Sequence, residues 1–451
     1  MDLVDSKHIL IVGFGITGTS VANYCIKKKI PFSIYDQKLS TEDIKQSPLS
    51  AHAKNIYSGV LTEDIFEVVD GVAMSPGVDP RNPIFKKIKQ SGTLFFNDLD
   101  LFANEIKNKS IKLIGITGSN GKTTVASLVK CLLDQYQVNA KLVGNIGIPI
   151  LDIVDELNND FVVMEASSFQ LELGTTLNFD IGVILNITED HMDRYDSFKD
   201  YIEAKFNLFK RSKIKIINYD DPVTHEWFDL NTIRLSASEK NLRKVDYYLS
   251  KEGKRSFTIK NQKNEINLSH LKFVGDHNFF NIMAAISVID QLGFSLNNMN
   301  SYLSNFKLAS HRLEWVRELK GVNFYNDSKA TNVASSIAAI ASFEEKKVLV
   351  IMGGDSKKQS LRPLYKCVDK FVKELFLIGK DANLFSEEFK TLKKININLC
   401  QSMREALNLA FNKSEKNDII LLSPACSSLD VYKNYMERGD EFKSLVMDLE
   451  E

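Results

Sequence analysis

The stretch that most constrains the fold lies at residues 112–134, where an apolar run, KLIGIT, is followed by the turn GSNGKTT and the helical run VASLVKCLLD. A buried strand, a tight glycine turn and a helix in this order are typical of a parallel α/β sheet. The backbone N–H groups of such a turn and the helix N-terminus together form an anion site. The pattern therefore predicts a phosphate-binding loop in an α/β domain.

The glycine spacing of this loop departs from the widespread G-x-x-x-x-G-K-[ST] pattern, because only two residues separate Gly118 from Gly121. The strand, the glycine turn and the helix that a phosphate loop requires are nevertheless present. Lys122 is placed to reach the β and γ phosphates of a nucleotide, and the Thr123 hydroxyl to ligate Mg²⁺. An ordinary turn with a capping threonine is the alternative, but Gly-Lys-Thr at a strand end favours phosphate binding. The predicted loop comprises Gly118, Ser119, Asn120, Gly121, Lys122, Thr123 and Thr124.

Charge and cysteine content exclude several classes of function. Lys plus Arg number 57 against 58 Asp plus Glu, so no net basic field attracts nucleic acid. The 5 cysteines form no C-x-x-C pair, which argues against a disulfide framework and a zinc site and favours a reducing cytoplasm. The first residues do not resemble a secretory signal, and no run of about 20 apolar residues occurs. We expect a cytoplasmic protein that does not insert into membranes.

Two further α/β series flank the one that contains the loop. The first hundred residues alternate short apolar strands with polar helical stretches, and a full G-x-G-x-x-G at residues 13–18 follows the first strand, with Asp36 ending the next. Taken alone, this pattern predicts dinucleotide binding. Residues 233–275 change to short alternating stretches, which we interpret as a β insertion or an edge sheet. A third α/β series begins near Ser310, with strands expected at VNFYND, KKVLVIMGG, ELFLIG and NDIILLSP.

Polar residues follow several predicted strands of the central series. Glu165 ends one strand, and Asp190 and His191 follow another. A carboxylate and a histidine at neighbouring strand ends beside a phosphate loop can hold a divalent cation, since Mg²⁺ completes its shell with phosphate and water. Lys205 lies on the amphipathic run 198–210 and by itself would count as a solvated lysine, because an ammonium repels metal ions.

The third series carries two lysine-containing turns, at residues 326–332 and 353–357, each at a strand end. A lysine with small hydroxyl or glycine neighbours suits the capture of a carboxylate, although two solvated surface turns are an equal alternative. Cys426 also follows a strand, but no Cys-His pairing in the sequence supports a nucleophile. We interpret it as a small buried thiol.

Ten motifs occur in order along nearly all of the chain: GFGITG, TGSNGKTT, GNIG, EASSFQLE, NITEDHMDRY, GDHNFFN, HRLE, NDSKATN, GGDSKK and LLSPACSSLD. In this order they resemble the ATP-dependent Mur ligases of peptidoglycan synthesis, and most closely the branch that adds D-glutamate to UDP-N-acetylmuramoyl-L-alanine. Ten ordered motifs are far more specific than any one of them. The short glycine spacing is thus similar to the phosphate loop of this family.

The resemblance implies an α/β protein of three domains. These are a Rossmann-like UDP-binding domain at 1–104, a central P-loop ATPase domain with a small β subsheet at 105–309, and a Rossmann-like D-glutamate-binding domain at 310–451. The glycine turn near the start is thereby reassigned from a dinucleotide to the uridine diphosphate of the substrate. The residues implied there are Gly15, Ile16, Thr17, Gly18, Asp36, Ser75, Pro76 and Gly77.

The resemblance also assigns roles at the reaction centre. Besides the phosphate loop, ATP would contact Asn278, Asn281, Arg312 and Asp327. Two Mg²⁺ ions would be held by Thr123, Glu165, His191 and Lys205, the last as a carbamate; with Lys122, the latter three form the implied catalytic set. Asn145 would contact the muramyl substrate, and D-glutamate would contact Lys329, Thr331, Lys357, Ser428, Leu429 and Tyr435. Carbamylation would turn a repelled cation into an oxygen-bearing anion.

The activity that the resemblance implies is amide ligation through an acyl phosphate, by a bacterial protein that we expect to be a monomer and that would serve cell-wall synthesis, cell shape and cell division. Alternatives within the same chemistry are a Mur ligase with another acceptor amino acid and a folylpolyglutamate synthetase-like ligase. Two alternatives come from other classes: an NAD-dependent oxidoreductase and a nucleotide-binding regulatory protein without catalysis. The first of these gives no account of TGSNGKTT.

Overall fold

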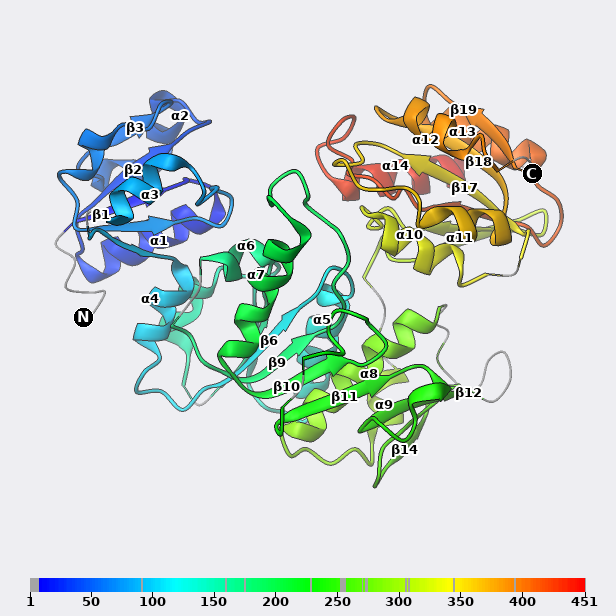
Figure 1. The fold of residues 1–451 in the computed structure, drawn as a ribbon, viewed down its shortest axis with the longest axis horizontal. Helices are drawn as coiled ribbons and strands as arrows, with labels where there is room; N and C mark the ends of the chain where they lie inside the picture. The colour runs from blue at the N-terminus through cyan, green and yellow to red at the C-terminus, as the bar shows by residue number, and fades with distance from the viewer. Residues whose placement is uncertain are drawn as a thin grey trace.

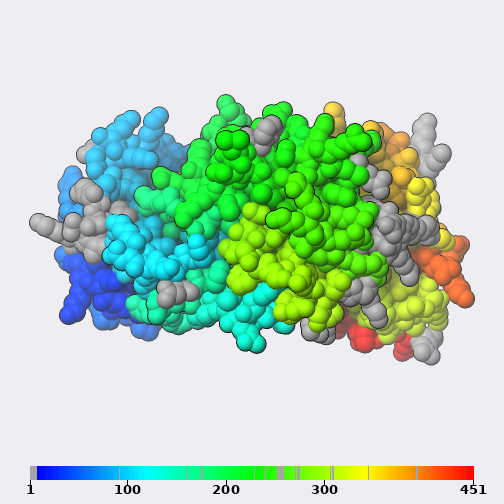
Figure 2. Space-filling view, turned by 90° about the horizontal axis from the view of Figure 1, so that it is seen from below, coloured from blue at the N-terminus to red at the C-terminus, as the bar shows by residue number. Residues whose placement is uncertain are grey.

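The computed structural model describes residues 8–450 except 91, 159, 174–175, 228, 252–256, 270, 272–274, 305, 307–308, 344 and 393–394. It contains a five-stranded, a nine-stranded and a six-stranded sheet, which follow one another in the sequence (Figure 1). The space-filling view shows the three parts in chain order along the long axis of the molecule (Figure 2). The three-domain α/β fold expected from the resemblance is confirmed, whereas the bounds of the domains stay a prediction.

The N-terminal sheet is entirely parallel and has the strand order β3-β2-β1-β4-β5. Its strands are β1 Ile9–Val12, β2 Phe32–Asp36, β3 Ile56–Ser58, β4 Gly71–Met74 and β5 Leu94–Phe96. Its helices are α1 Ile16–Lys28, α2 Thr41–Lys45 and α3 Pro83–Gln90, with 3₁₀ turns at Pro48–His52 and Glu63–Phe66. Because β1 and β4 are buried along their whole length, they read as continuous apolar runs, as strands of a parallel sheet do.

The central sheet has the order β14-β13-β12-β11-β10-β9-β6-β8-β7. It is parallel from β7 to β12, and at the other edge β13 pairs antiparallel with both β12 and β14. The β subsheet predicted from the alternating stretches is this edge. The strands are β6 Lys112–Thr117, β7 Ala140–Gly144, β8 Phe161–Glu165, β9 Phe179–Ile184, β10 Ser212–Asn218, β11 Thr232–Ser236, β12 Tyr247–Lys251, β13 Phe257–Lys260 and β14 Glu265–Asn267. The helices are α4 Asp98–Glu105, which leads in from the first sheet, α5 Lys122–Gln135, α6 Ser168–Glu172, α7 Phe198–Lys210, α8 Asp276–Gln291 and α9 Met299–Ser304, with 3₁₀ turns at Ile150–Glu156 and Glu239–Asn241.

The C-terminal sheet has the order β15-β16-β20-β17-β18-β19, with only β15 antiparallel to its neighbour. Its strands are β15 Glu314–Leu319, β16 Val322–Asn326, β17 Val348–Gly353, β18 Val372–Ile378, β19 Asn396–Leu399 and β20 Ile419–Leu422. Its helices are α10 Val333–Ile340, α11 Leu364–Phe371, α12 Ala382–Phe389, α13 Met403–Lys413 and α14 Tyr435–Asp448. The four strands predicted for this series are present as β16, β17, β18 and β20.

The buried apolar clusters join the first two parts of the chain but leave the third apart. One cluster runs from the N-terminal sheet through α4 to the central sheet, and includes Ile9, Phe102, Val162 and Leu208. In the described part of the chain, the two clusters of the C-terminal domain contain buried residues only between 313 and 446. Among the described residues, the C-terminal domain therefore shares no buried apolar cluster with the other two domains.

Among the residues that the structure describes, we find no helix with the length and apolarity that a membrane crossing requires.

Candidate active site

The phosphate loop connects β6 to α5, as its sequence predicts, and its two glycines are required by backbone geometry. Gly118 and Gly121 have φ angles of 152° and 86°, which other residues rarely adopt. A Cβ atom on Gly121 would also lie only 2.6 Å from the Asn281 side-chain oxygen. The loop is held from below by Asn186, whose side-chain oxygen accepts the Asn120 N–H at 2.8 Å. The Asn186 amide in turn donates to the Asn120 carbonyl at 3.0 Å.

Two lysines meet beneath this loop at one carbonyl oxygen. The Nζ atoms of Lys122 and Lys205 donate to the Gly118 carbonyl at 2.8 and 2.9 Å. Lys205 is only 1% exposed, so the sequence reading of α7 as carrying a solvated lysine there is wrong. Burial lowers the pKa of Lys205 well below its usual value, and the neighbouring Lys122 charge lowers it further. Burial and the Lys122 charge thus both disfavour the ammonium form of Lys205.

Glu165, at the end of β8, offers a free carboxylate oxygen inside the site. Its Oε1 accepts the Asn145 amide at 2.8 Å, while Oε2 is buried and has no hydrogen-bond partner. An unpartnered buried oxygen of this kind is costly unless a cation or a donor completes it. Among the described residues, no three His, Cys, Asp or Glu side chains gather as a metal cluster. The free Oε2 of Glu165 is a donor that suits Mg²⁺, which takes few protein oxygens and completes its shell with phosphate and water.

His191 follows β9 in the left-handed region, with φ of 58°, beside Asp190. Burial lowers the pKa of the His191 imidazole to about 4, so the ring is neutral near pH 7 and has a lone pair for a metal. The ring of Phe169 packs edge-on against it, with centroids 4.9 Å apart. Burial alone would raise the pKa of Asp190, but the charges of His191 and Lys357 and the Asn332 amide hold it below its usual value.

The C-terminal domain presents its own set of cations to the site. Burial lowers the pKa of Lys329 to about 8, helped by the charges of Arg312 and Lys122. The Lys329 ammonium lies 4.0 Å from the ring centroid of Tyr435. The Lys357 ammonium donates to Asp190 of the central domain at 3.3 Å. The Asp327 carboxylate accepts hydrogen bonds from the Leu313 N–H and the Ser423 hydroxyl. Burial raises the pKa of Asp327 to about 7.

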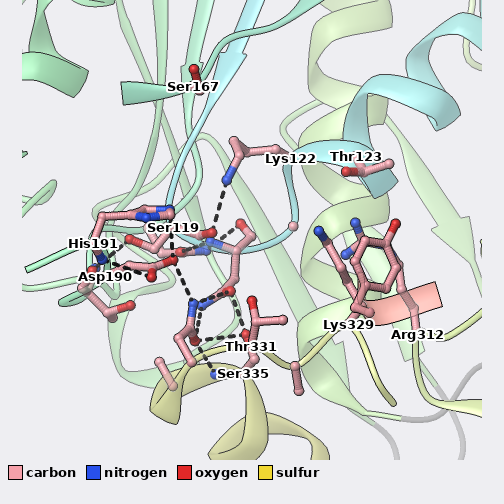
Figure 3. A pocket seen from close by; sticks show the side chains of 18 of the residues that line it. Ser119, Lys122, Thr123, Ser167, Asp190, His191, Arg312, Lys329, Thr331 and Ser335 are labelled. Carbon is pink, nitrogen blue, oxygen red and sulfur yellow. Dashed lines mark hydrogen bonds and ion pairs between the residues drawn. The ribbon is translucent and has the colours of Figure 1, made fainter. Parts of the chain in front are cut away.

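One cavity of about 590 Å³ collects these residues, and Figure 3 shows the phosphate loop facing Lys329 and Arg312 across it. This size suits a nucleotide-scale ligand. Predicted residues that line the cavity are Ser119, Asn120, Gly121, Lys122, Thr123, Thr124, Asn145, Glu165, His191, Lys205, Asn278, Asn281, Arg312, Asp327, Lys329, Thr331, Lys357, Ser428, Leu429 and Tyr435. The structure therefore brings the predicted ATP, metal and amino-acid residues together.

The residues predicted for the UDP group meet elsewhere, at the carboxyl edge of β1, β2 and β4, and do not line this cavity. Asp36 accepts the Phe14 N–H at 2.8 Å, and the Ser75 hydroxyl donates to the Gly13 carbonyl at 2.7 Å. A Cβ atom on Gly18 would lie 2.0 Å from the same carbonyl. Ile16 is 78% exposed. The turn is thus tightly packed from behind and open on its outer side, but its ligand stays a prediction.

Several residues that line the cavity were not predicted as site residues from the sequence. Asn186, Asn332 and Ser335 all line the cavity. Asn332 was noticed only as part of a lysine-containing turn, and Asn186 only within a motif. Arg194 lies just outside, where its guanidinium donates to the Pro76 and Val78 carbonyls and joins the N-terminal domain to the central one. For Asn186, just beyond the end of β9, the available signal was its position after a predicted strand, where ligands of α/β sheets bind. Ser335, which lies inside α10, and Arg194 had no such signal.

Comparison with known proteins matches three family models along the chain. These are the Mur ligase MurD-like N-terminal domain over residues 7–95, the Mur ligase middle domain over 116–289, and the Mur ligase glutamate ligase domain over 311–426. A UDP-N-acetylmuramoylalanine–D-glutamate ligase of Coxiella burnetii (strain Dugway 5J108-111) is 35% identical over 441 residues, covering 97% of this chain and 98% of its own. The enzyme of that name from Nitrosomonas europaea is 33% identical over 456 residues, covering 98% and 96%.

Solved structures agree at the level of the fold. UDP-N-acetylmuramate-alanine ligase from Thermotoga maritima superposes with a TM-score of 0.59 at 17% identity, covering 98% of this chain and 99% of its own. MurF ligase from the same organism, in complex with ADP, gives 0.62 at 17% identity, with the same coverage. With its fold, its phosphate loop and these full-length relatives, the chain belongs to the Mur ligase family. Its curated relatives carry the name of the D-glutamate-adding member.

Proposed function

We propose that this protein joins D-glutamate to UDP-N-acetylmuramoyl-L-alanine at the expense of ATP, as its curated relatives are named to do. The observation that carries the proposal is that the phosphate loop and the lysines of the C-terminal domain line one cavity. A ligase needs its activating phosphate and its incoming amine in one place, and this cavity provides sites for both. A cytoplasmic location, a monomeric state and a role in cell division stay predictions.

In the first step, a carboxylate oxygen of the L-alanine moiety attacks the γ-phosphorus of ATP and the bond to the ADP oxygen breaks, which leaves an acyl phosphate. Phosphoryl transfer asks the protein mainly to position and to neutralise oxygens. Lys122 and the loop N–H groups serve this role, together with Asn278, Asn281, Arg312 and Asp327 around the nucleotide. In the structure, the Lys122 ammonium donates to the Gly118 and Ser119 carbonyls, which hold it beside the loop.

Thr123, Glu165, His191 and Lys205 would hold Mg²⁺, which supplies positive charge for the phosphate oxygens when bound. The free Oε2 of Glu165 and the neutral imidazole of His191 support this assignment. For Lys205 we propose a carbamate, formed when the neutral amine attacks CO₂ and loses a proton. The two lysines at the Gly118 carbonyl support it, because a carbamate beside Lys122 replaces a like-charge contact with an opposite-charge one.

In the second step, the amine of D-glutamate attacks the acyl carbon, and phosphate leaves as the amide forms. Lys329, Lys357 and Thr331, with Ser428, Leu429 and Tyr435, are proposed to hold the D-glutamate carboxylates. Asn145 is proposed to contact the muramyl substrate. At the N-terminal domain, the turn that contains Gly15 to Gly18, with Asp36 and Ser75 to Gly77, is proposed to bind the uridine diphosphate.

A phosphate-release assay tests the proposal. Release should require ATP, the UDP-muramyl substrate and D-glutamate together. The same assay with L-alanine, L-lysine, L-glutamate and diaminopimelate tests the acceptor. Release with another amino acid but not with D-glutamate would contradict the acceptor assignment, and NADH turnover or ATP binding without turnover would contradict the ligase.

A further inference from the structure

A group of polar side chains bridges the phosphate loop and the start of α10 in the C-terminal domain (Figure 3). The Asn120 amide donates to the Asn332 side-chain oxygen at 3.3 Å, and the Asn332 amide donates back to the Asn120 oxygen at 3.1 Å. The Ser335 hydroxyl donates to the same Asn120 oxygen at 2.5 Å. The Asn332 amide also donates to Asp190 at 3.2 Å. The Asn120 side chain thus accepts two hydrogen bonds from the C-terminal domain and donates one to it.

Asn332 holds its amide in a fixed direction because it is the N-cap of α10. Its side-chain oxygen accepts the Ser335 N–H at 2.9 Å, as an N-cap does. That bond leaves the two N–H donors of the amide pointing away from the helix, and both are used on central-domain acceptors. Asn332 is 2% exposed, so its bonds are shielded from water. Asn332 therefore caps α10 and also bonds the central domain.

Among the described residues, no buried apolar cluster joins the C-terminal domain to the central one, so these hydrogen bonds are not supplemented by a shared core. Its described buried clusters stay within residues 313–446, whereas the N-terminal and central domains share one cluster. The ion pair between Lys357 and Asp190, at 3.3 Å, is a further polar contact between this domain and the central one. A small number of hydrogen bonds can thus set how often the domain is closed.

We propose that Asn332 and Ser335 are positioning residues that latch the C-terminal domain onto the phosphate loop through Asn120. The latch places Lys329 and Lys357 over the loop. Because Asn120 lies within the loop, a ligand that fixes the loop also fixes the acceptor of the latch, so phosphate binding favours closure. The effect on amino-acid binding rests on the proposed function, whereas the latch itself does not.

Small-angle X-ray scattering of the full chain with Mg²⁺ and a non-hydrolysable ATP analogue tests the latch without any activity. Ser335→Ala removes one bond, and Asn332→Ser keeps an oxygen that can cap α10 while losing both amide donors. Ser414→Ala is the matched control, since the Ser414 hydroxyl donates to the Phe411 carbonyl at the end of its own helix. Both latch variants should show a larger radius of gyration than wild type and Ser414→Ala.

Kinetics and a double variant complete the test. In Ser335→Ala and Asn332→Ser the KM for the amino acid should rise about three- to tenfold per lost bond, with a smaller change in the KM for ATP. In an Asn120→Ala background, Ser335→Ala should have no further effect on the radius of gyration. Wild-type compaction in both latch variants, or a full additional effect of Ser335→Ala without Asn120, would overturn the proposal. If ligation with D-glutamate failed, the scattering result would still decide the latch.

Discussion

The carbamate proposed for Lys205 is the most specific chemical prediction for the site, and Lys205→Ala tests it. The substitution removes a side chain that is 1% exposed and bonds the Gly118 carbonyl at 2.9 Å. If Lys205 is a carbamate, the variant also loses an anion that would face Mg²⁺ and Lys122. We expect nearly complete loss of ligation.

The magnitude follows from what is lost in the transition state. Removing one preorganised charge contact from a desolvated site costs about 3 kcal/mol, or about a hundredfold in rate. Loss of the single hydrogen bond to Gly118 costs only about 1 kcal/mol of stability. The variant should therefore fold, with a melting temperature a few degrees lower, while its rate falls by about a hundredfold or more.

The assay is phosphate release with and without a short carboxylic acid in the buffer. Acetate or formate should partly restore activity, because a carboxylate can occupy the space of the missing carbamate, and an alkyl amine should not. As a matched control, Lys199→Ala on the solvent side of the same helix should keep wild-type activity, since its side chain is 82% exposed. Full activity of Lys205→Ala would refute the carbamate, and rescue by an amine alone would indicate an ammonium.

Four further predictions concern the loop, the amino-acid site and the N-terminal turn. Lys122→Ala should lower the ligation rate by about a hundredfold, because the γ-phosphate loses its fixed cation; near-normal turnover would contradict the phosphate-loop assignment. Lys357→Ala should raise the KM for D-glutamate by about ten- to a hundredfold and leave that for ATP nearly unchanged; the reverse pattern would move the amino-acid site elsewhere. Since the Lys329 ammonium loses its proton as pH rises through a pKa of about 8, the KM for D-glutamate should climb above that pH, and Lys329→Arg should remove the inflection. Gly18→Ala would place a Cβ atom 2.0 Å from the Gly13 carbonyl, so both the melting temperature and UDP-substrate binding should fall; an unchanged melting temperature in calorimetry would contradict this packing.

The fold was predictable where strands are apolar along their length and end at glycines. The phosphate loop is the clearest case, since its strand, turn and helix occur as the sequence indicates. Strands β3 and β19 were not predicted, because they lie at sheet edges and are short and only partly buried. Strand β15 is antiparallel and half-exposed, so its residues lack the apolar run of the other strands.

The site was predictable from motifs, but the state of individual side chains was not. Lys205 lies on a helix whose amphipathic pattern is correct, yet that local pattern does not indicate that the phosphate loop lies against this position and buries the lysine. Asn332 is an ordinary N-cap by its sequence, and its bonds to Asn120 exist only because two domains meet there. Contacts between residues 212 positions apart leave no local signal.

The transfer of an oxygen atom tests the central claim most directly. UDP-N-acetylmuramoyl-L-alanine labelled with ¹⁸O in its carboxylate is incubated with the protein, ATP, Mg²⁺ and D-glutamate, and the released phosphate is analysed by mass spectrometry. An acyl phosphate requires that one carboxylate oxygen leave with phosphate, so the account predicts ¹⁸O in the inorganic phosphate and formation of the D-glutamyl amide. Unlabelled phosphate, or a labelled AMP in its place, would contradict it.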